Sequence, residues 1–170
     1  MVTQALERIP SEFGGLDFLV NSTAVGLCSP VETYSLDNQQ TMATNVTRVF
    51  LYRKAAIPLL RQRSDGQIIT ISSGAGKRAY ANLAAYSTSK FAVMGFMESL
   101  TEEAGPRGIK CTTIVLGSIL TDFGPCPIEQ KRGGGKKYLR PEDVAVAVLV
   151  LQVLRQPEHV WTQEINRWPF

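Results

Sequence analysis

Two side chains near the middle of the chain are spaced so that they could do acid–base chemistry together. The stretch AAYSTSKFAVMGF, residues 84–96, carries Tyr86 and Lys90 four positions apart among small and apolar residues. On a helix, positions i and i+4 are neighbours on one face. A cation held beside a phenol favours the phenolate and lowers the phenol's pKa, which makes the tyrosine a usable general acid or base. The spacing therefore indicates chemistry on a carbonyl–alcohol pair.

A hydroxyl donor stands shortly before this stretch. Ser72 and Ser73 end the apolar run QIITISS, and Ser73 lies thirteen positions before Tyr86. A hydroxyl close to a reacting carbonyl steadies the oxyanion that develops there. Taken alone, the pair Tyr86 and Lys90 also fits an exposed phenol and a lysine whose stem lies along the surface, and serine pairs are common in turns. The order of these groups along the chain favours a site.

The elements that would position these groups follow from hydrophobic periodicity and turn residues. The predicted helices cover 1–9 (ended by Pro10), 36–62 (capped by Ser35), 84–104 and a stretch that begins near Pro141, with Glu142 and Asp143 at its positive end. The predicted strands cover 16–21, 67–72, 109–116 and part of 160–167. Residues 117–140, rich in Gly, Pro and Lys, are predicted to form a loop or substrate flap.

Apolar strands that alternate with long helices predict an α/β fold with a parallel sheet covered on both faces. In such sheets, ligands bind at the carboxyl ends of the strands. The three strand ends read VNSTAVG, ISSGAG and VLGSILT, which are small, polar and glycine-bearing. This composition suits a flat ligand that approaches the backbone closely.

Composition excludes several classes of function. The 170 residues suit a single domain over 1–170, and 44% hydrophobic with 19% charged residues is ordinary for a globular protein. A net charge of +3 on scattered residues gives no reason to expect a nucleic acid partner. Cys28, Cys111 and Cys126 lack metal-ligand spacing and fit reduced thiols in the cytoplasm, so no metal is expected. The apolar run 145–154 is too short to cross a membrane, and no secretory signal is visible, so no membrane partner is expected.

From about Leu16 to the end, the chain resembles the carboxyl-terminal two-thirds of a short-chain dehydrogenase/reductase. The resemblance is carried by Ser73 with Tyr86-x-x-x-Lys90, by NVTRVF, by VNSTAVG at the place of the family's NNAG, and by VLGSILT at the place of its PG followed by Thr. It implies a Rossmann-type fold, an NAD or NADP cofactor and a small-molecule alcohol or carbonyl substrate. The helices 36–62 and 84–104 correspond to the family's usual dimer surface, so a homo-oligomer is expected.

The same resemblance implies a role for each site residue. Tyr86 would be the general acid in reduction and the base in oxidation, and Lys90 would lower the pKa of Tyr86 and hold the ribose hydroxyls of the cofactor. Ser73 would hydrogen-bond the substrate carbonyl, and Asn45 would hold a water of the proton relay. The implied cofactor-binding residues are Asn21, Ala24, Tyr86, Lys90, Gly117, Ile119 and Thr121.

The match departs from the family pattern in three places. Ser22, Thr23 and Ala24 replace Asn-Ala-Gly, and Leu116 replaces the proline of the PG motif. These 170 residues also contain no glycine-rich TGxxxGxG turn for the pyrophosphate and no residue that would select NAD from NADP. We therefore expect an amino-terminally truncated domain that binds dinucleotide weakly and is impaired or inactive by itself. The alternatives are a non-catalytic partner of a full-length relative and nucleotide-sugar epimerase chemistry.

The remaining candidates have plainer interpretations. The glycines at 133–135 lie among basic residues, but no Ser or Thr follows as in a P-loop, so a solvated loop is favoured over a phosphate cradle. His159, Asp122 and Glu129 are expected to be solvated. Trp161 and Trp168 are expected to be core or interface aromatics.

Overall fold

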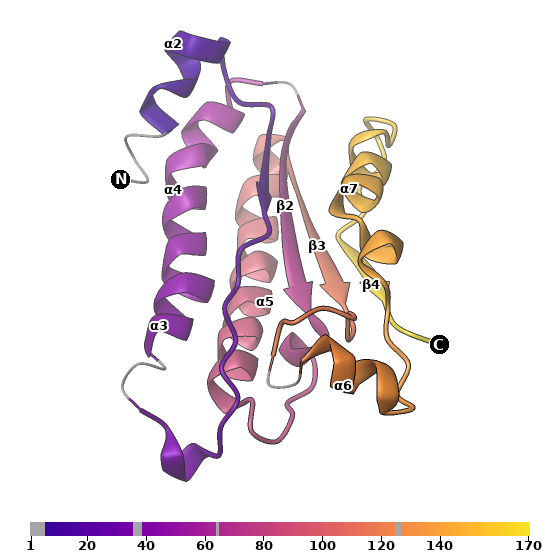
Figure 1. Cartoon of the computed structure of the whole chain (residues 1–170). Coiled ribbons are helices and arrows are strands. Elements are labelled where there is room, and N and C mark those ends of the chain that lie inside the picture. The colour runs from indigo at the N-terminus through magenta and orange to yellow at the C-terminus, as the bar shows by residue number, and fades with distance from the viewer. Residues whose placement is uncertain (1–5, 36–38, 64, 125–126) are drawn as a thin grey trace.

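The computed structural model describes residues 6–35, 39–63, 65–124 and 127–170. Its centre is a parallel sheet with the strand order β1 (Phe18–Asn21), β2 (Gly66–Ser73), β3 (Ile109–Leu116) and β4 (Glu164–Arg167) (Figure 1). Ser73 lies opposite Leu116, and Leu116 lies opposite Arg167. The carboxyl ends of these strands therefore meet at one edge of the sheet. The predicted adjacency of the first three strands, with the last strand outside them, is confirmed.

Helices cover both faces of this sheet. They are α2 (Ile9–Phe13), α3 (Gln39–Met42), a π-helical segment (Ala43–Thr47), α4 (Arg48–Leu60), α5 (Ala84–Ala104), α6 (Ile128–Gly133) and α7 (Val146–Leu154), with 3-10 helices at Val31–Thr33, Gly74–Gly76, Gly105–Arg107 and Pro141–Val144. Helices α4 and α5 lie on one side of β2 and β3, and α7 lies on the other side (Figure 1).

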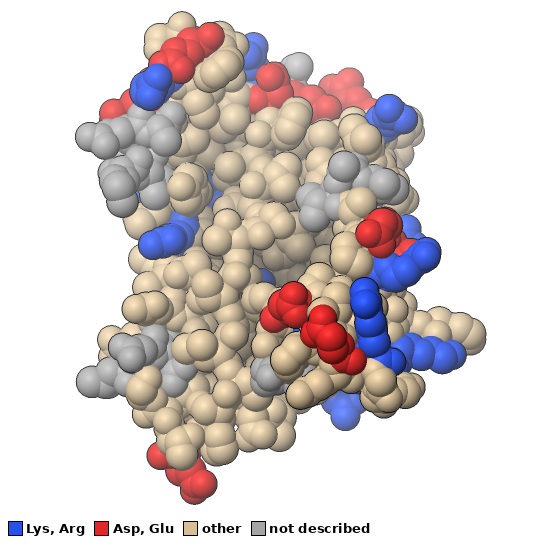
Figure 2. Space-filling view, in the orientation of Figure 1, with Lys and Arg blue, Asp and Glu red and all other residues tan. Residues whose placement is uncertain are grey.

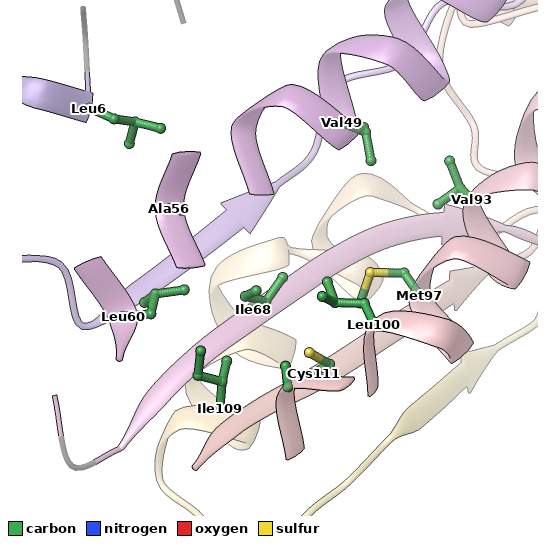
Figure 3. Close-up of a cluster of buried hydrophobic side chains, with 11 residues drawn as sticks. Leu6, Val49, Ala56, Leu60, Ile68, Val93, Met97, Leu100, Ile109 and Cys111 are labelled. Carbon is green, nitrogen blue, oxygen red and sulfur yellow. The ribbon is translucent and has the colours of Figure 1, made fainter. Parts of the chain in front are cut away.

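Two apolar clusters hold these layers together, because successive side chains of a strand point to opposite faces. Ile68 of β2 points toward α4 and α5 and belongs to one cluster with Met97 (Figure 3). The next residue, Ile69, points the other way and packs in a second cluster with Ile114 of β3 and Val150 of α7. Strands buried on both faces are typical of parallel sheets. The predicted Rossmann-type sheet flanked by helices is confirmed.

The prediction for the first helix was wrong at its end. Part of it falls on residues 1–5, which lie outside the described residues. Leu6 and Glu7 are helical, and α2 then starts at Ile9 with Pro10 in its first turn. Proline is tolerated there because its missing N–H has no intrahelical acceptor in a first turn. Gly14 ends α2 in the left-handed region, with φ 76°.

The predicted helix over 36–62 is present from Gln39 to Leu60, and its proposed start after Ser35 lies outside the described residues. A π-helical turn at Ala43–Thr47 interrupts its α-helical hydrogen bonding. Such single π turns occur frequently at functional sites. Helix α5 has the bounds that the sequence predicts, Ala84–Ala104.

Residues 117–140 contain more regular structure than the sequence predicts. Ile119 pairs with Leu139 in an isolated parallel bridge, and α6 lies between them. The six residues of α6 are too few to show a helical period, so the prediction of a loop was wrong over this stretch. Beyond it, Pro141 begins a 3-10 helix, and α7 follows. In the described part of the chain, no helix combines the length and apolarity that a membrane crossing needs.

Candidate active site

A cavity of about 500 Å³ lies at the carboxyl ends of β2 and β3. Seven of the residues predicted to act on substrate or cofactor line it: Ala24, Ser73, Tyr86, Lys90, Gly117, Ile119 and Thr121. They come from the segment after β1, the end of β2, the first two turns of α5 and the segment after β3. Figure 2 shows that charged side chains gather over α6 and around the periphery of this face, while much of the surface between them is uncharged.

Tyr86 and Lys90 project from α5 into this cavity, as their spacing predicts. Both side chains are buried, and the Lys90 ammonium lies 5.6 Å from the centre of the Tyr86 ring. Burial lowers the pKa of Lys90 to about 8. Burial also raises the pKa of Tyr86, and hydrogen bonding from the Ser73 side chain offsets part of that rise.

The pKa of Tyr86 therefore moves in the direction opposite to the one expected from the sequence. The sequence supplies a nearby cation, which favours the phenolate. It cannot supply the degree of burial, which disfavours the charged form and is the larger effect here.

Ser73 reaches the cavity from the last position of β2. Its backbone is extended, and its hydroxyl accepts a hydrogen bond from the Ala75 amide at 3.2 Å, which caps the 3-10 helix Gly74–Gly76. This cap holds the Ser73 hydroxyl on the Tyr86 side of the strand end. Ser72 also lines the cavity, but its hydroxyl is buried and has no hydrogen-bond partner among the described residues.

Asn45 does not line the cavity, although its role as a site residue was predicted. It is 1% exposed in the π-helical segment, and its amide pairs with the backbone of Val25 on both sides, accepting from the N–H at 2.9 Å and donating to the carbonyl at 2.8 Å. It also donates to Ser89, whose hydroxyl donates to the Tyr86 carbonyl. The Asn45 side chain thus ties the segment after β1 to the start of α5.

Asn21 is also absent from the cavity lining. It ends β1 opposite Thr70, and its amide nitrogen is buried without a hydrogen-bond partner among the described residues. The nearby Gly26 does line the cavity, and a Cβ there would lie 2.9 Å from the Phe123 ring and 3.1 Å from the Tyr86 ring. The segment after β1 therefore approaches the tyrosine as closely as a glycine allows.

Several lining residues were not foreseen, and Trp168 is the main correction. Trp168 is 47% exposed and lines the cavity, which rules out the expected core position, while the alternative of an interface position stays a prediction. A Cβ at Gly74 would overlap the Trp168 ring, and one at Gly117 would lie 3.0 Å from it. Gly74 and Gly117 were the sequence signal for a large side chain at this place, because glycines at adjacent strand ends leave room for an aromatic ring. Trp161 does pack against the core, and its indole donates to the Cys111 carbonyl at 3.0 Å.

Residues 117–140 contribute a buried lysine that sequence reasoning did not single out. Lys131 of α6 donates hydrogen bonds to the carbonyls of Thr121 and Phe123, and it lines the cavity. It therefore holds the segment after β3 in place. His159 is exposed, as expected.

Comparisons with known proteins agree with this geometry. A family profile described as short chain dehydrogenase matches residues 1–129. The chain belongs to the short-chain dehydrogenase family. An uncharacterised oxidoreductase of Staphylococcus aureus (strain MRSA252) is 32% identical over 171 residues, which cover 99% of this chain and 71% of the relative. The family is one of oxidoreductases, as the resemblance implied.

Two further relatives carry more specific descriptions. A D-threitol dehydrogenase of Mycolicibacterium smegmatis is 33% identical over 158 residues, which cover 88% of this chain and 61% of that protein. A metagenomic short-chain oxidoreductase, solved in complex with NADP, superposes with a TM-score of 0.79 at 25% identity, covering 99% of this chain and 68% of that one.

Proposed function

We propose that the chain interconverts an alcohol and a carbonyl compound with a nicotinamide cofactor, using Tyr86, Lys90 and Ser73. The observation that carries this proposal is the convergence of a phenol, an ammonium and a hydroxyl on one cavity at the strand ends. These groups come from β2 and α5, so the fold assembles them from separate segments.

Each of the three groups has a separate task. The Ser73 hydroxyl donates a hydrogen bond to the substrate oxygen and steadies its developing negative charge. The raised pKa keeps Tyr86 protonated at neutral pH, so in reduction its hydroxyl can give a proton to that oxygen. The Lys90 ammonium favours the phenolate that remains, which limits the cost of the transfer. In oxidation, the same phenolate takes the proton back.

The residues present fit the nicotinamide half of such a cofactor, which supplies or accepts the hydride when it is bound. Lys90 presents a buried ammonium to the cavity, and Gly117 and Thr121 line the cavity beside it. Asn21 lies outside the lining, at the end of β1, and its buried amide nitrogen has no partner among the described residues. A relative of similar fold was solved with NADP, which supports a nicotinamide cofactor here. In the part of the chain that the structure describes, no segment fits the pyrophosphate or distinguishes NAD from NADP.

A homo-oligomer formed through α4 and α5 is part of the proposal. These helices expose three large apolar side chains: Phe50 at 45%, Leu51 at 41% and Phe91 at 45%. Burying such side chains between two copies would be favourable. Light scattering coupled to size-exclusion chromatography on wild type and on Phe91→Glu tests this, since a charge in a buried interface should shift the chain to monomer.

The direct test of the catalytic proposal is Tyr86→Phe. This change keeps the ring and removes only the hydroxyl, so the turnover of carbonyl substrates with NADH or NADPH at millimolar concentration should fall to background. Tyr52→Phe is the matched control, because Tyr52 packs against the first apolar cluster away from the cavity. Equal turnover above background by wild type and Tyr86→Phe would overturn the proposal.

A further inference from the structure

The chemistry of the cavity wall points to a class of substrate. We propose that the cavity takes an aromatic carbonyl compound whose ring lies against Trp168, with an anionic ring substituent preferred. This inference rests on the proposed function only in assuming that a carbonyl oxygen binds near Ser73 and Tyr86. The binding surface itself is argued from the lining residues.

The first support is the placement of the Trp168 ring. It covers Gly74, the residue directly after Ser73, and Gly117, the residue directly after β3. Two contacts fix the tail that carries Trp168: the Gly117 amide donates to the Arg167 carbonyl at 2.7 Å, and Pro169 packs beside Gly117. A flat aromatic surface is therefore held next to the group that would bind the carbonyl oxygen.

The second support is the aromatic character of the remaining wall. Phe123 packs against Tyr86 with 5.6 Å between ring centres, and Tyr138 and Tyr80 also line the cavity. Aromatic rings prefer offset-stacked or edge-to-face neighbours at such distances. A small polyol, such as the substrate named for the D-threitol dehydrogenase relative, would leave these surfaces without a partner.

The third support is the sign of the charge around the cavity. Its charged lining residues are Lys90, Lys131 and Lys136, and the lining described contains no acidic side chain. The Lys136 ammonium lies 5.4 Å from the centre of the Tyr138 ring, on an exposed part of the wall. A cavity lined by one sign of charge attracts ligands of the opposite sign.

The experiment compares three ketones with the same ring and carbonyl: 4-acetylbenzoate, acetophenone and 4-acetyl-N,N,N-trimethylanilinium. Titration calorimetry without cofactor should give the tightest binding for the anion and the weakest for the cation, with a difference of about tenfold or more at low salt that shrinks as salt rises. Lys136→Gln should narrow this difference severalfold. Lys137→Gln is the matched control, because Lys137 lies outside the cavity lining. Equal affinity for the three ketones would overturn the charge preference.

The two tryptophans give a second, independent measurement. In Trp161→Phe, Trp168 is the remaining indole, and 4-acetylbenzoate should quench its fluorescence to a plateau. In Trp168→Phe, Trp161 remains beside the core, and the same ligand should give only a small linear decrease. Trp168→Ala should weaken binding of 4-acetylbenzoate about tenfold. Circular dichroism checks that each variant is folded.

Three outcomes would overturn the inference: quenching without a plateau in Trp161→Phe, tighter binding of D-threitol than of acetophenone, or quenching of Trp168 by reduced nicotinamide mononucleotide but not by the ketones. The outcome for the proposed function is separate. Turnover of a bound ketone that Tyr86→Phe leaves unchanged would overturn the catalytic proposal alone, whereas turnover of small polyols without ketone binding would overturn the aromatic substrate alone.

Discussion

Two buried cations, Arg53 of α4 and Lys90 of α5, differ in where their donors point. Arg53 is 0% exposed, and its guanidinium donates to the Val49 carbonyl and the Thr70 hydroxyl and lies 5.6 Å from the centre of the Phe96 ring. Lys90 is 4% exposed, and it lines the cavity. Among the residues that the structure describes, neither takes part in an ion pair.

Both cations are buried and both pay an electrostatic cost for it. Burial alone therefore cannot show which of them has a structural role and which a functional one. Burial lowers the pKa of Arg53 to about 10 and that of Lys90 to about 8. The difference is that Arg53 directs donors of both terminal nitrogens to partners inside the core, whereas the ammonium of Lys90 faces a space large enough for a ligand. A buried charge is informative about function when its hydrogen-bonding capacity is directed into a cavity.

The largest expected effect is on the affinity for the cofactor, of which Lys90 is proposed to hold the nicotinamide half. The 170-residue chain should bind NADH and NADPH several powers of ten more weakly than a chain with a phosphate-binding turn, because each lost charge-assisted hydrogen bond costs about 1.5–3 kcal/mol. Titration calorimetry measures this, and micromolar affinity would contradict it. Reduced nicotinamide mononucleotide should bind to wild type and to Arg53→Met but not to Lys90→Met.

The second effect is on catalysis. Lys90→Met removes the cation beside Tyr86 and should lower kcat/KM by about 10²–10⁴, the usual contribution of a general acid–base system. Arg53→Met keeps the buried volume and should leave kcat/KM within about twofold. Steady-state kinetics at millimolar cofactor measures both, and an equal loss in the two variants would remove the distinction between the cations.

A smaller effect tests the internal hydrogen bonds of Arg53. Thr70→Val keeps the shape of the side chain but leaves a guanidinium donor without its partner, which should lower the free energy of unfolding by about 1–3 kcal/mol. Thr70→Ser retains the hydroxyl and serves as the control. Urea unfolding measures the free energy of unfolding of both variants, of Arg53→Met and of Thr70→Val combined with Arg53→Met. In the Arg53→Met background, Thr70→Val should cause no further loss of stability, because the guanidinium donor is absent. A loss that persists in the double variant would mean that packing around Thr70, and not the hydrogen bond, is responsible.

The smallest effect is on the pH dependence of stability. The folded pKa of Lys90, about 8, lies below its ordinary value of 10.5, so above pH 8 the unfolded chain holds a proton that the folded chain has released. The free energy of unfolding should therefore rise by about 1 kcal/mol between pH 8 and 9. Below pH 8 both states are protonated, and the full cost of burying the charge is present.

Urea unfolding at pH 7.5, 8.0, 8.5 and 9.0 measures this slope. It should be lost in Lys90→Met and kept in Arg53→Met, because the pKa of Arg53 lies well above this window. The range ends at pH 9 because the folded pKa of Cys111 is raised from 9.0 to about 11, so that above pH 9 its thiol ionises first in the unfolded chain and lowers the free energy of unfolding. A flat profile in wild type would contradict a buried, ionisable Lys90.

Local patterns were sufficient for much of the fold. The bounds of α5 follow from its helical period, and the strands β2 and β3 follow from apolar runs that begin after Asp65 and Gly108. Pro10 misled the prediction because proline both ends helices and starts them, and only the chain around it decides which. The helix α6 was missed because its six residues have no clear apolar face.

For the candidate site, spacing along the chain identified the groups but not their surroundings. The positions of Ser73, Tyr86 and Lys90 in the sequence were enough to place them on one cavity, since a strand end and the next helix bring them together. The burial that raises the pKa of Tyr86 comes from segments far away in the sequence, including Gly26 and Phe123. The engagement of Asn45 with Val25 and the position of Trp168 over Gly74 also depend on contacts across the fold. Residue types and short spacings thus establish which chemistry is available, because they act locally; burial and long-range packing establish its electrostatics and the shape of the cavity.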